Sequence, residues 1–261
     1  MQQLSGQDAM FLHAEIDGLP QHIGGVSIYD QSTAPGGKVR FKQILAMLES
    51  RLHLSPIFRR KLAFVPYGLG RPYWVEDPDF DLEYHVRHIA LPKPGDWRQL
   101  CILAARIHAV PLRRDKPMWE MYVIEGLNNV EGYPPGCFAI LLKVHHCAMD
   151  GATGTQFMNI VHDLTPETSD PGKAPPWIVE RPSTFRMLAQ AYVDAWKKPG
   201  QTLEMLKEAG PAFMRIRRGR QARQIHSLDE KPRTRFQGRI SRHRVVDARK
   251  FDFETIRAIK N

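Results

Sequence analysis

The chain has 261 residues with 43% hydrophobic and 25% charged side chains, proportions that exclude a wholly disordered or collagen-like protein. Its mean hydropathy is −0.39, no apolar run approaches the ~18 residues needed to cross a bilayer, and the first residues lack the basic start of a signal peptide. The three cysteines lack zinc-ribbon spacing, and a reducing cytoplasm is the simplest compartment for them.

The positive charge of the chain is concentrated late in the sequence. The whole chain has 37 Lys and Arg against 28 Asp and Glu, and residues 196–250 alone hold 16 basic and 5 acidic side chains. A segment of this kind suits a nucleic acid, a phosphorylated ligand or an anionic membrane surface. It is equally compatible with an ordinary solvated helical face.

The predicted elements begin with a short helix. Ser5, followed three residues later by Asp8, predicts a helix start over residues 4–12. In chain order there follow a strand over residues 22–29, a helix over 39–53, and strand patterns over 62–76 and 84–91.

A second capped helix comes next. Asp96 with Gln99 predicts a helix that reaches about Ala109. After it come a strand over residues 118–124, the clearest strand pattern of the chain over 137–146, and a helix over 155–164. Because strands and helices interleave, the pattern favours an α/β, mixed-sheet layered architecture.

The chain changes character after residue 164. Residues 165–183 are rich in proline and predict a stiff connector, and residues 184–238 predict a basic helical segment broken near Pro199 and Gly200. A strand is expected over residues 239–246 and a helix from Asp252 to Lys260. Residues 1–164 would then be the main domain, and residues 239–261 would lead into a second half of a larger protein.

The chemistry is concentrated where the strand over 137–146 ends. Side chains alternate across a strand, so His145 and His146 cannot both face one cleft while the strand stays regular. His146 ends an otherwise apolar row and is predicted to be the desolvated imidazole, with a pKa near neutrality. Asp150 lies in the following turn, where it could orient a histidine or anchor the turn, and Gly151 lets the backbone turn without a Cβ clash.

Other interpretations of this stretch remain open. The two histidines could be ordinary strand-end residues followed by a capping aspartate. Two histidines and an aspartate could also form an open metal triad, although their opposite orientations argue against a metal site. Cys147 as a nucleophile is weaker still, because it is adjacent to His146 and would point away from it.

The seven residues from His145 to Gly151 resemble the HHxxxDG motif of CoA-dependent acyltransferases of the chloramphenicol acetyltransferase-like fold. Flanking blocks narrow the resemblance to the N-terminal half of bacterial wax ester synthase/diacylglycerol acyltransferases. These blocks are residues 4–11, 22–25, 74–77, 79–88 and 117–120. Pro117, Met118 and Trp119 stand where that family has its PLW motif. Arg113 stands where the family usually has aspartate, so an ion pair of this loop is expected to be rearranged.

The resemblance implies transfer of a fatty acyl group from acyl-CoA to a long-chain alcohol or diacylglycerol, giving wax ester or triacylglycerol. His146 would be the general base, His145 would support its geometry, and Asp150 would serve structure and orientation. No serine stands in a nucleophile-elbow setting, which favours direct transfer over a covalent acyl-enzyme. Acyl-CoA is a co-substrate, and no bound cofactor or metal is expected. The resemblance also implies an active site between two halves, with the C-terminal half supplied by a second chain or fragment.

The basic segment interleaves its charges with apolar residues, which favours peripheral contact with an anionic membrane or lipid droplet on the cytoplasmic side. The candidate contact residues are Arg215, Arg217, Arg218 and Arg220. Packing of these helices on the second half is the competing interpretation. A nucleic-acid-binding protein and a non-catalytic scaffold on the same fold are the alternative functions, and neither explains the HHxxxDG motif.

Overall fold

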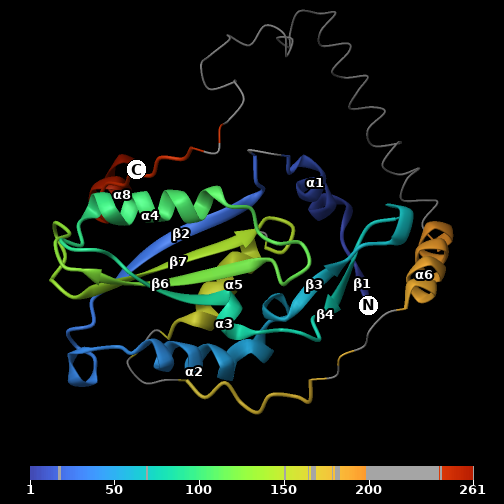
Figure 1. Cartoon of the computed structure of the whole chain (residues 1–261), viewed down its shortest axis with the longest axis horizontal. Helices are drawn as coiled ribbons and strands as arrows, with labels where there is room; N and C mark the ends of the chain where they lie inside the picture. The colour runs from blue at the N-terminus through green and yellow to red at the C-terminus, as the bar shows by residue number, and fades with distance from the viewer. Residues whose placement is uncertain are drawn as a thin grey trace, which may run out of the picture.

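The computed structural model describes residues 1–16, 19–68, 70–149, 151–163, 165, 169–177, 179, 183–197, 241 and 243–260. Its centre is a four-stranded mixed sheet with helices on both faces (Figure 1). The α/β, mixed-sheet layered architecture predicted from the sequence is therefore confirmed.

The central sheet has the strand order β2 (His22–Tyr29), β7 (Cys137–His145), β6 (Trp119–Leu127) and β5 (Val86–Ala90). The pairs β2–β7 and β7–β6 are antiparallel, and the pair β5–β6 is parallel. A parallel pair needs a crossover connection. Helix α4 (Trp97–Ala109) supplies it between β5 and β6.

Helix α4 covers one face of this sheet, and helices α2 (Phe41–Arg51) and α5 (Gly151–Val161) cover the other (Figure 1). The alternation along β7 follows from this arrangement. Phe138 and Val144 pack in the cluster formed with α2 and α5, whereas Ala139 and Leu141 pack in the cluster formed with α4. Both faces of β7 are thus buried, which agrees with its nearly continuous apolar sequence.

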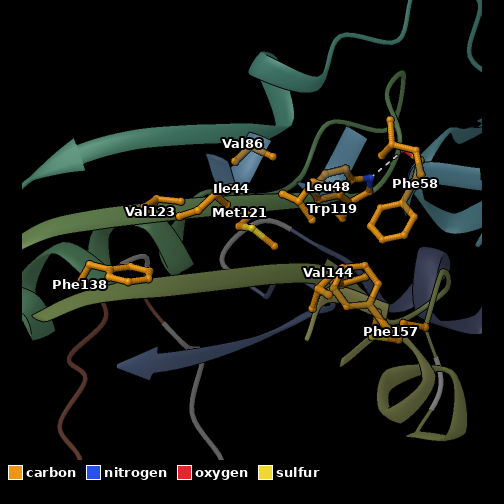
Figure 2. Packing of buried hydrophobic residues seen from close by; sticks show 13 residues of the cluster. Ile44, Leu48, Phe58, Val86, Trp119, Met121, Val123, Phe138, Val144 and Phe157 are labelled. Carbon is orange, nitrogen blue, oxygen red and sulfur yellow. Dashed lines mark hydrogen bonds between the residues drawn. The ribbon is translucent and has the colours of Figure 1, made fainter. Parts of the chain in front are cut away.

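The cluster on the α2 and α5 side surrounds Trp119 (Figure 2). Trp119 is fully buried, and its indole N–H donates to the carbonyl of Phe58 at 3.0 Å. The rings of the two residues meet edge to face at 5.5 Å between centroids. The indole therefore fills the core without leaving its N–H unpaired, which would be costly at this depth.

A smaller three-stranded sheet lies beside the central one. It consists of β1 (Gln2–Gln3), β4 (Tyr73–Glu76) and β3 (Arg60–Ala63), with β4 in the middle. Helix α1 (Gly6–Ala14) follows β1 and lies near the ends of β2 and β7 (Figure 1). The remaining described helices are α3 (Leu82–His85), α6 (Thr184–Lys197) and α8 (Phe253–Lys260), besides short 3₁₀ turns.

Both predicted helix caps are confirmed. The side chain of Ser5 accepts from the N–H of Asp8, and Asp96 with Gln99 forms a capping box at the start of α4. Several boundaries differ from the prediction; for example, β6 ends at Leu127 instead of residue 124 and α5 at Val161 instead of residue 164. The strand predicted from residue 84 begins at Val86, because Asp81 caps the helical turn α3 before it. Helix α5 begins at Gly151, four residues early, because packing of its C-terminal half overrides the low helix propensity of its glycines.

The strand predicted over residues 239–246 is wrong for the described part of that range. Residues 241 and 243–246 have no regular secondary structure, and the side chain of Val245 is 95% exposed. A strand needs a partner for its backbone groups, and none of the described strands pairs with these residues. The helix predicted near Asp252 is present as α8, and most of the basic segment 184–238 lies outside the described residues.

Candidate functional site

The candidate site is built where β7 ends. His145 is the last residue of the strand and pairs with His22 of β2. The pairing extends one residue further, since the N–H of His146 donates to the carbonyl of Gln21 at 2.8 Å. A turn follows, in which the N–H of Ala148 donates to the carbonyl of His145 at 2.9 Å. The backbone of both histidines is therefore fixed by neighbouring segments.

The imidazole of His145 is fully buried. Its Nδ1 accepts a hydrogen bond from the backbone N–H of Cys147 at 3.1 Å, so the neutral ring carries its proton on Nε2. Nε2 lies 3.6 Å from Oε1 of Glu15. Burial lowers the pKa of His145 to about 4, an effect that the nearby carboxylate of Glu15 only partly offsets. His145 is thus a neutral imidazole at physiological pH.

Glu15 contacts three separate segments of the chain, which contain Arg114, Gln21 and His145. Its Oε2 accepts from Arg114 through Nη2 at 2.7 Å and Nε at 3.1 Å, and its Oε1 accepts from the N–H of Gln21 at 3.2 Å. The same Arg114 also donates to the carbonyl of Leu12 near the end of α1. Although burial opposes ionisation, the hydrogen bonds from Arg114 and Gln21 lower the pKa of Glu15. The carboxylate is therefore ionised and held in place on both sides.

The ring of His146 has a different setting. It is half-buried and stacks on Phe11 of α1, with ring centroids 4.6 Å apart and an angle of 11° between the planes. Its backbone is held by Gln21, which in turn is held by Glu15. The result is an accessible imidazole on a fixed backbone, which is the arrangement that a general base requires.

The prediction that His146 is the desolvated imidazole is wrong. The desolvated ring belongs to His145, and the ring of His146 remains partly accessible. The reason is local: His146 follows the last residue of β7 and lies in the turn, where its ring stacks on Phe11. His145 instead points into the space closed by Glu15.

The three residues of the predicted PLW-like motif are buried beside the histidines. The carbonyl of Met118 accepts from the N–H of His145 at 3.0 Å, and its sulfur lies 3.5 Å from Sγ of Cys147. Trp119 begins β6, and its carbonyl accepts from Nδ1 of His85 at 2.7 Å. Pro117 precedes them. Their contacts support the backbone under the two histidines, and their side chains belong to the core.

The loop before this motif contains two separate ion pairs. Arg113 pairs with Asp115 at 2.5 Å in a solvent-exposed position, while Arg114 turns inward to Glu15. Burial raises the pKa of the Cys147 thiol to about 12, so this cysteine is protonated and unsuited to act as a nucleophile. Among the residues described, no three His, Cys, Asp or Glu side chains gather in a metal-binding arrangement.

Several predicted residues cannot be placed. Asp150 and the four arginines of the proposed membrane contact lie outside the described residues, and Gly151 is seen only as the first residue of α5. Sequence reasoning in turn missed Glu15, Arg114 and Gln21, which hold the histidines in place. Glu15 follows a short helix and Arg114 lies in a loop. Because 99 residues separate them, the sequence gives no sign that they are close in space.

Comparison with known proteins gives consistent results. The family described as the wax ester synthase/diacylglycerol acyltransferase catalytic domain matches residues 4–261. A Mycobacterium tuberculosis protein named as a diacylglycerol O-acyltransferase is 31% identical over 262 residues, and the chain spans 51% of its length. A second protein of that organism, named tgs3, is 35% identical over 213 residues, which are 79% of this chain and 73% of tgs3.

Among solved structures, the wax ester synthase/diacylglycerol acyltransferase of Marinobacter aquaeolei VT8 aligns with 67% of this chain and 40% of its own, with a TM-score of 0.50 and 31% identity. The fold of the described residues is thus similar to the corresponding part of that enzyme. The chain spans about half the length of the first of these relatives and less than half of the solved one.

Proposed function

Because the chain belongs to the wax ester synthase/diacylglycerol acyltransferase family, we propose that it supplies the base of an enzyme that transfers a fatty acyl group from acyl-CoA to a long-chain alcohol or to diacylglycerol. One observation supports this assignment more than any other. The ring of His146 is accessible, while its backbone is fixed by Gln21 and its ring face by Phe11.

In the proposed reaction the hydroxyl oxygen of the alcohol attacks the thioester carbonyl carbon of acyl-CoA. An alcohol is a weak nucleophile at neutral pH, so the imidazole of His146 takes its proton as the C–O bond forms. The C–S bond then breaks, and the imidazolium returns the proton to the CoA sulfur. The products are an ester and free CoA, and no covalent acyl-enzyme is needed. General-base catalysis of this kind contributes typically ~10²–10⁴-fold in rate.

His145 and Glu15 have supporting roles in this proposal. His145 stays neutral because it is buried, so in this proposal it supports the site without taking up a proton. Glu15 fixes the loop that carries Gln21 and thereby the backbone of His146. Neither residue needs to touch the substrate. Asp150 is proposed to shape the following turn.

The test is a pair of alanine variants in the full-length polypeptide. His146→Ala should lower kcat for ester formation by at least 100-fold while acyl-CoA binding persists, because a lost base affects the transition state and not ground-state affinity. His145→Ala should lower kcat less and the melting temperature more, because its ring is fully buried. A His146→Ala enzyme that kept a tenth of the rate would contradict the assignment.

We also propose how this polypeptide meets its apolar substrates. None of the helices described is long and apolar enough to cross a membrane. Helix α8 nevertheless exposes Phe253, Ile256 and Ile259 along one face, which suits burial against the C-terminal part of the enzyme. The basic segment would then hold the assembled enzyme on the cytoplasmic surface of an anionic membrane or lipid droplet.

A further inference from the structure

A small cavity of about 80 Å³ lies between the central sheet and the helices α2 and α5. Gly25 of β2, Leu142 of β7 and Met121 of β6 form part of its sheet side, and Met47 of α2 and Met158 of α5 contribute to the helix side. Methionine side chains are unbranched and adaptable, which suits an apolar ligand of variable length. The volume is well above the ~10–15 Å³ that a single water-sized group needs.

The few polar groups of this cavity satisfy one another. The hydroxyl of Tyr29 donates to Nε2 of His162 at 2.5 Å, and Nδ1 of His162 donates to the carbonyl of Met158 at 3.0 Å. Ser27 places its hydroxyl beside Tyr29. No charged side chain of the described residues lines the cavity. A polar or charged ligand would therefore lose its hydration without gaining partners, whereas an alkyl chain would gain apolar contacts.

The position of the cavity relates it to His146. Leu142 is four residues before His146, and Ile140, which also lines the cavity, is six residues before it. At about 3.3 Å per residue these positions lie roughly 13–20 Å from the proposed base, within reach of an extended fatty chain. Ile23 and Gly25 of β2 pair with Val144 and Leu142 and share their face. Both are exposed, so the described residues leave this strip of β2 uncovered.

Gly25 keeps this strip open. A Cβ atom at Gly25 would meet no atom within 4 Å, so a side chain there would extend into the free space in front of the cavity. The neighbouring Gly24 differs, because its Cβ would lie 3.0 Å from Nδ1 of His108 and 3.2 Å from the carbonyl oxygen of Leu142. Gly24 is thus required for packing on the α4 side, whereas Gly25 leaves space that the fold itself does not need.

We propose that this cavity binds the distal end of an unbranched alkyl chain of one substrate, and that Gly25 and Met158 set the chain length that it accepts. The inference rests on the proposed acyl transfer, since it places the reacting end of the same substrate at His146. The chain belongs either to the acyl-CoA or to the alcohol, and the two sources share the chemistry that the cavity recognises.

The experiment compares Gly25→Val with the unchanged full-length enzyme. Valine suits an exposed strand position and finds open space there, so the fold should tolerate it. One arm varies the acyl-CoA chain length with a fixed short alcohol, and the other varies the alcohol length with a fixed short acyl-CoA. The ratio of kcat/KM for long chains to that for short chains should fall about tenfold or more, and the arm in which it falls identifies the source.

Met158→Trp narrows the same space from the helix side, where Met158 is 40% exposed, and should shift the ratio in the same direction. Val26→Leu is the matched control, because Val26 is also exposed but points to the opposite face of β2. A ratio unchanged in both arms, or a loss that is equal for all chain lengths, would overturn the inference. If the unchanged enzyme transferred no acyl group at all, the proposed function would fail instead.

Discussion

Replacing Glu15 by glutamine tests how the site is held together. The substitution keeps the shape of the side chain and removes its charge. If the amide oxygen of glutamine takes the place of Oε1, it still accepts from the N–H of Gln21, but the amide N–H groups then face Arg114, which needs an acceptor. In the opposite orientation the amide N–H groups face Nε2 of His145, which also needs an acceptor. Under the proposed function, Glu15→Gln should therefore loosen the connection between Arg114 and the two histidines without touching the substrate site itself.

The expected magnitude follows from burial. The side chain of Glu15 is 8% exposed and that of Arg114 is 39% exposed. Breaking a fully buried ion pair costs about 3–5 kcal/mol, but Arg114 can be rehydrated, so a loss of about 1–3 kcal/mol in unfolding free energy is expected. The melting temperature should fall by roughly 2–4 °C for each kcal/mol. A displacement of His146 by about 1 Å can cost up to ~100-fold in kcat.

The assay measures kcat, KM and the melting temperature of the full-length enzyme. Asp115→Asn is the matched control, because it removes an arginine–carboxylate pair of the same loop whose two side chains are each 60% exposed. Such exposed pairs contribute about 0–1 kcal/mol, so this control should behave like the unchanged protein. Glu15 does not hold the base in place if Glu15→Gln behaves like the control, or if it lowers the melting temperature while kcat stays the same.

Three further outcomes are expected. Burial lowers the pKa of His22 and of His145 from 6.5 to about 4. The unfolded chain therefore binds protons below pH 6.5 that the native protein does not, and urea unfolding at pH 5 should give a free energy lower by roughly 2 kcal/mol per histidine than at pH 7. Residues 1–261 expressed alone should not transfer acyl groups and should associate through α8. Monodisperse and fully active material would contradict the proposal that a C-terminal half completes the active site. Replacing four arginines by glutamine should weaken sedimentation with anionic vesicles by about 1 kcal/mol per residue, and unchanged binding would favour packing of this segment within the enzyme. These arginines are Arg215, Arg217, Arg218 and Arg220.

The elements that could be predicted from the sequence are those whose signal is local. The caps at Ser5 and Asp96 depend on side chains within three residues of the helix start, and the two faces of β7 follow from its alternation. The strand predicted near residue 245 is absent, because a local pattern alone is not sufficient to form a strand. Its alternating pattern is local, but a strand also needs a partner, and Val245 has none among the described strands.

The candidate site could be located from the sequence but not described. The HHxxxDG pattern directed attention to the end of β7, because two adjacent histidines there are unusual. It could not show which ring is buried, since that depends on Glu15 and Phe11, which lie over a hundred residues away and approach only in the fold. The network of Arg114, Glu15 and Gln21 is a set of long-range contacts, and no periodicity in the sequence encodes it.

The two histidines differ in a way that matters for the proposed reaction. A proton on His145 would have to enter a buried site, and its pKa of about 4 keeps that ring neutral even beside the carboxylate of Glu15. If His146 takes the proton of the alcohol, this proton cannot pass to His145 and remains where the leaving sulfur can collect it. A charge on His146 lowers the pKa of His145 further, so protonation of His146 would favour the neutral form of His145. Under the proposed function, His146 would thus act as the base and His145 as its rigid, uncharged support, and replacing His145 should alter the placement of the base more than its chemistry.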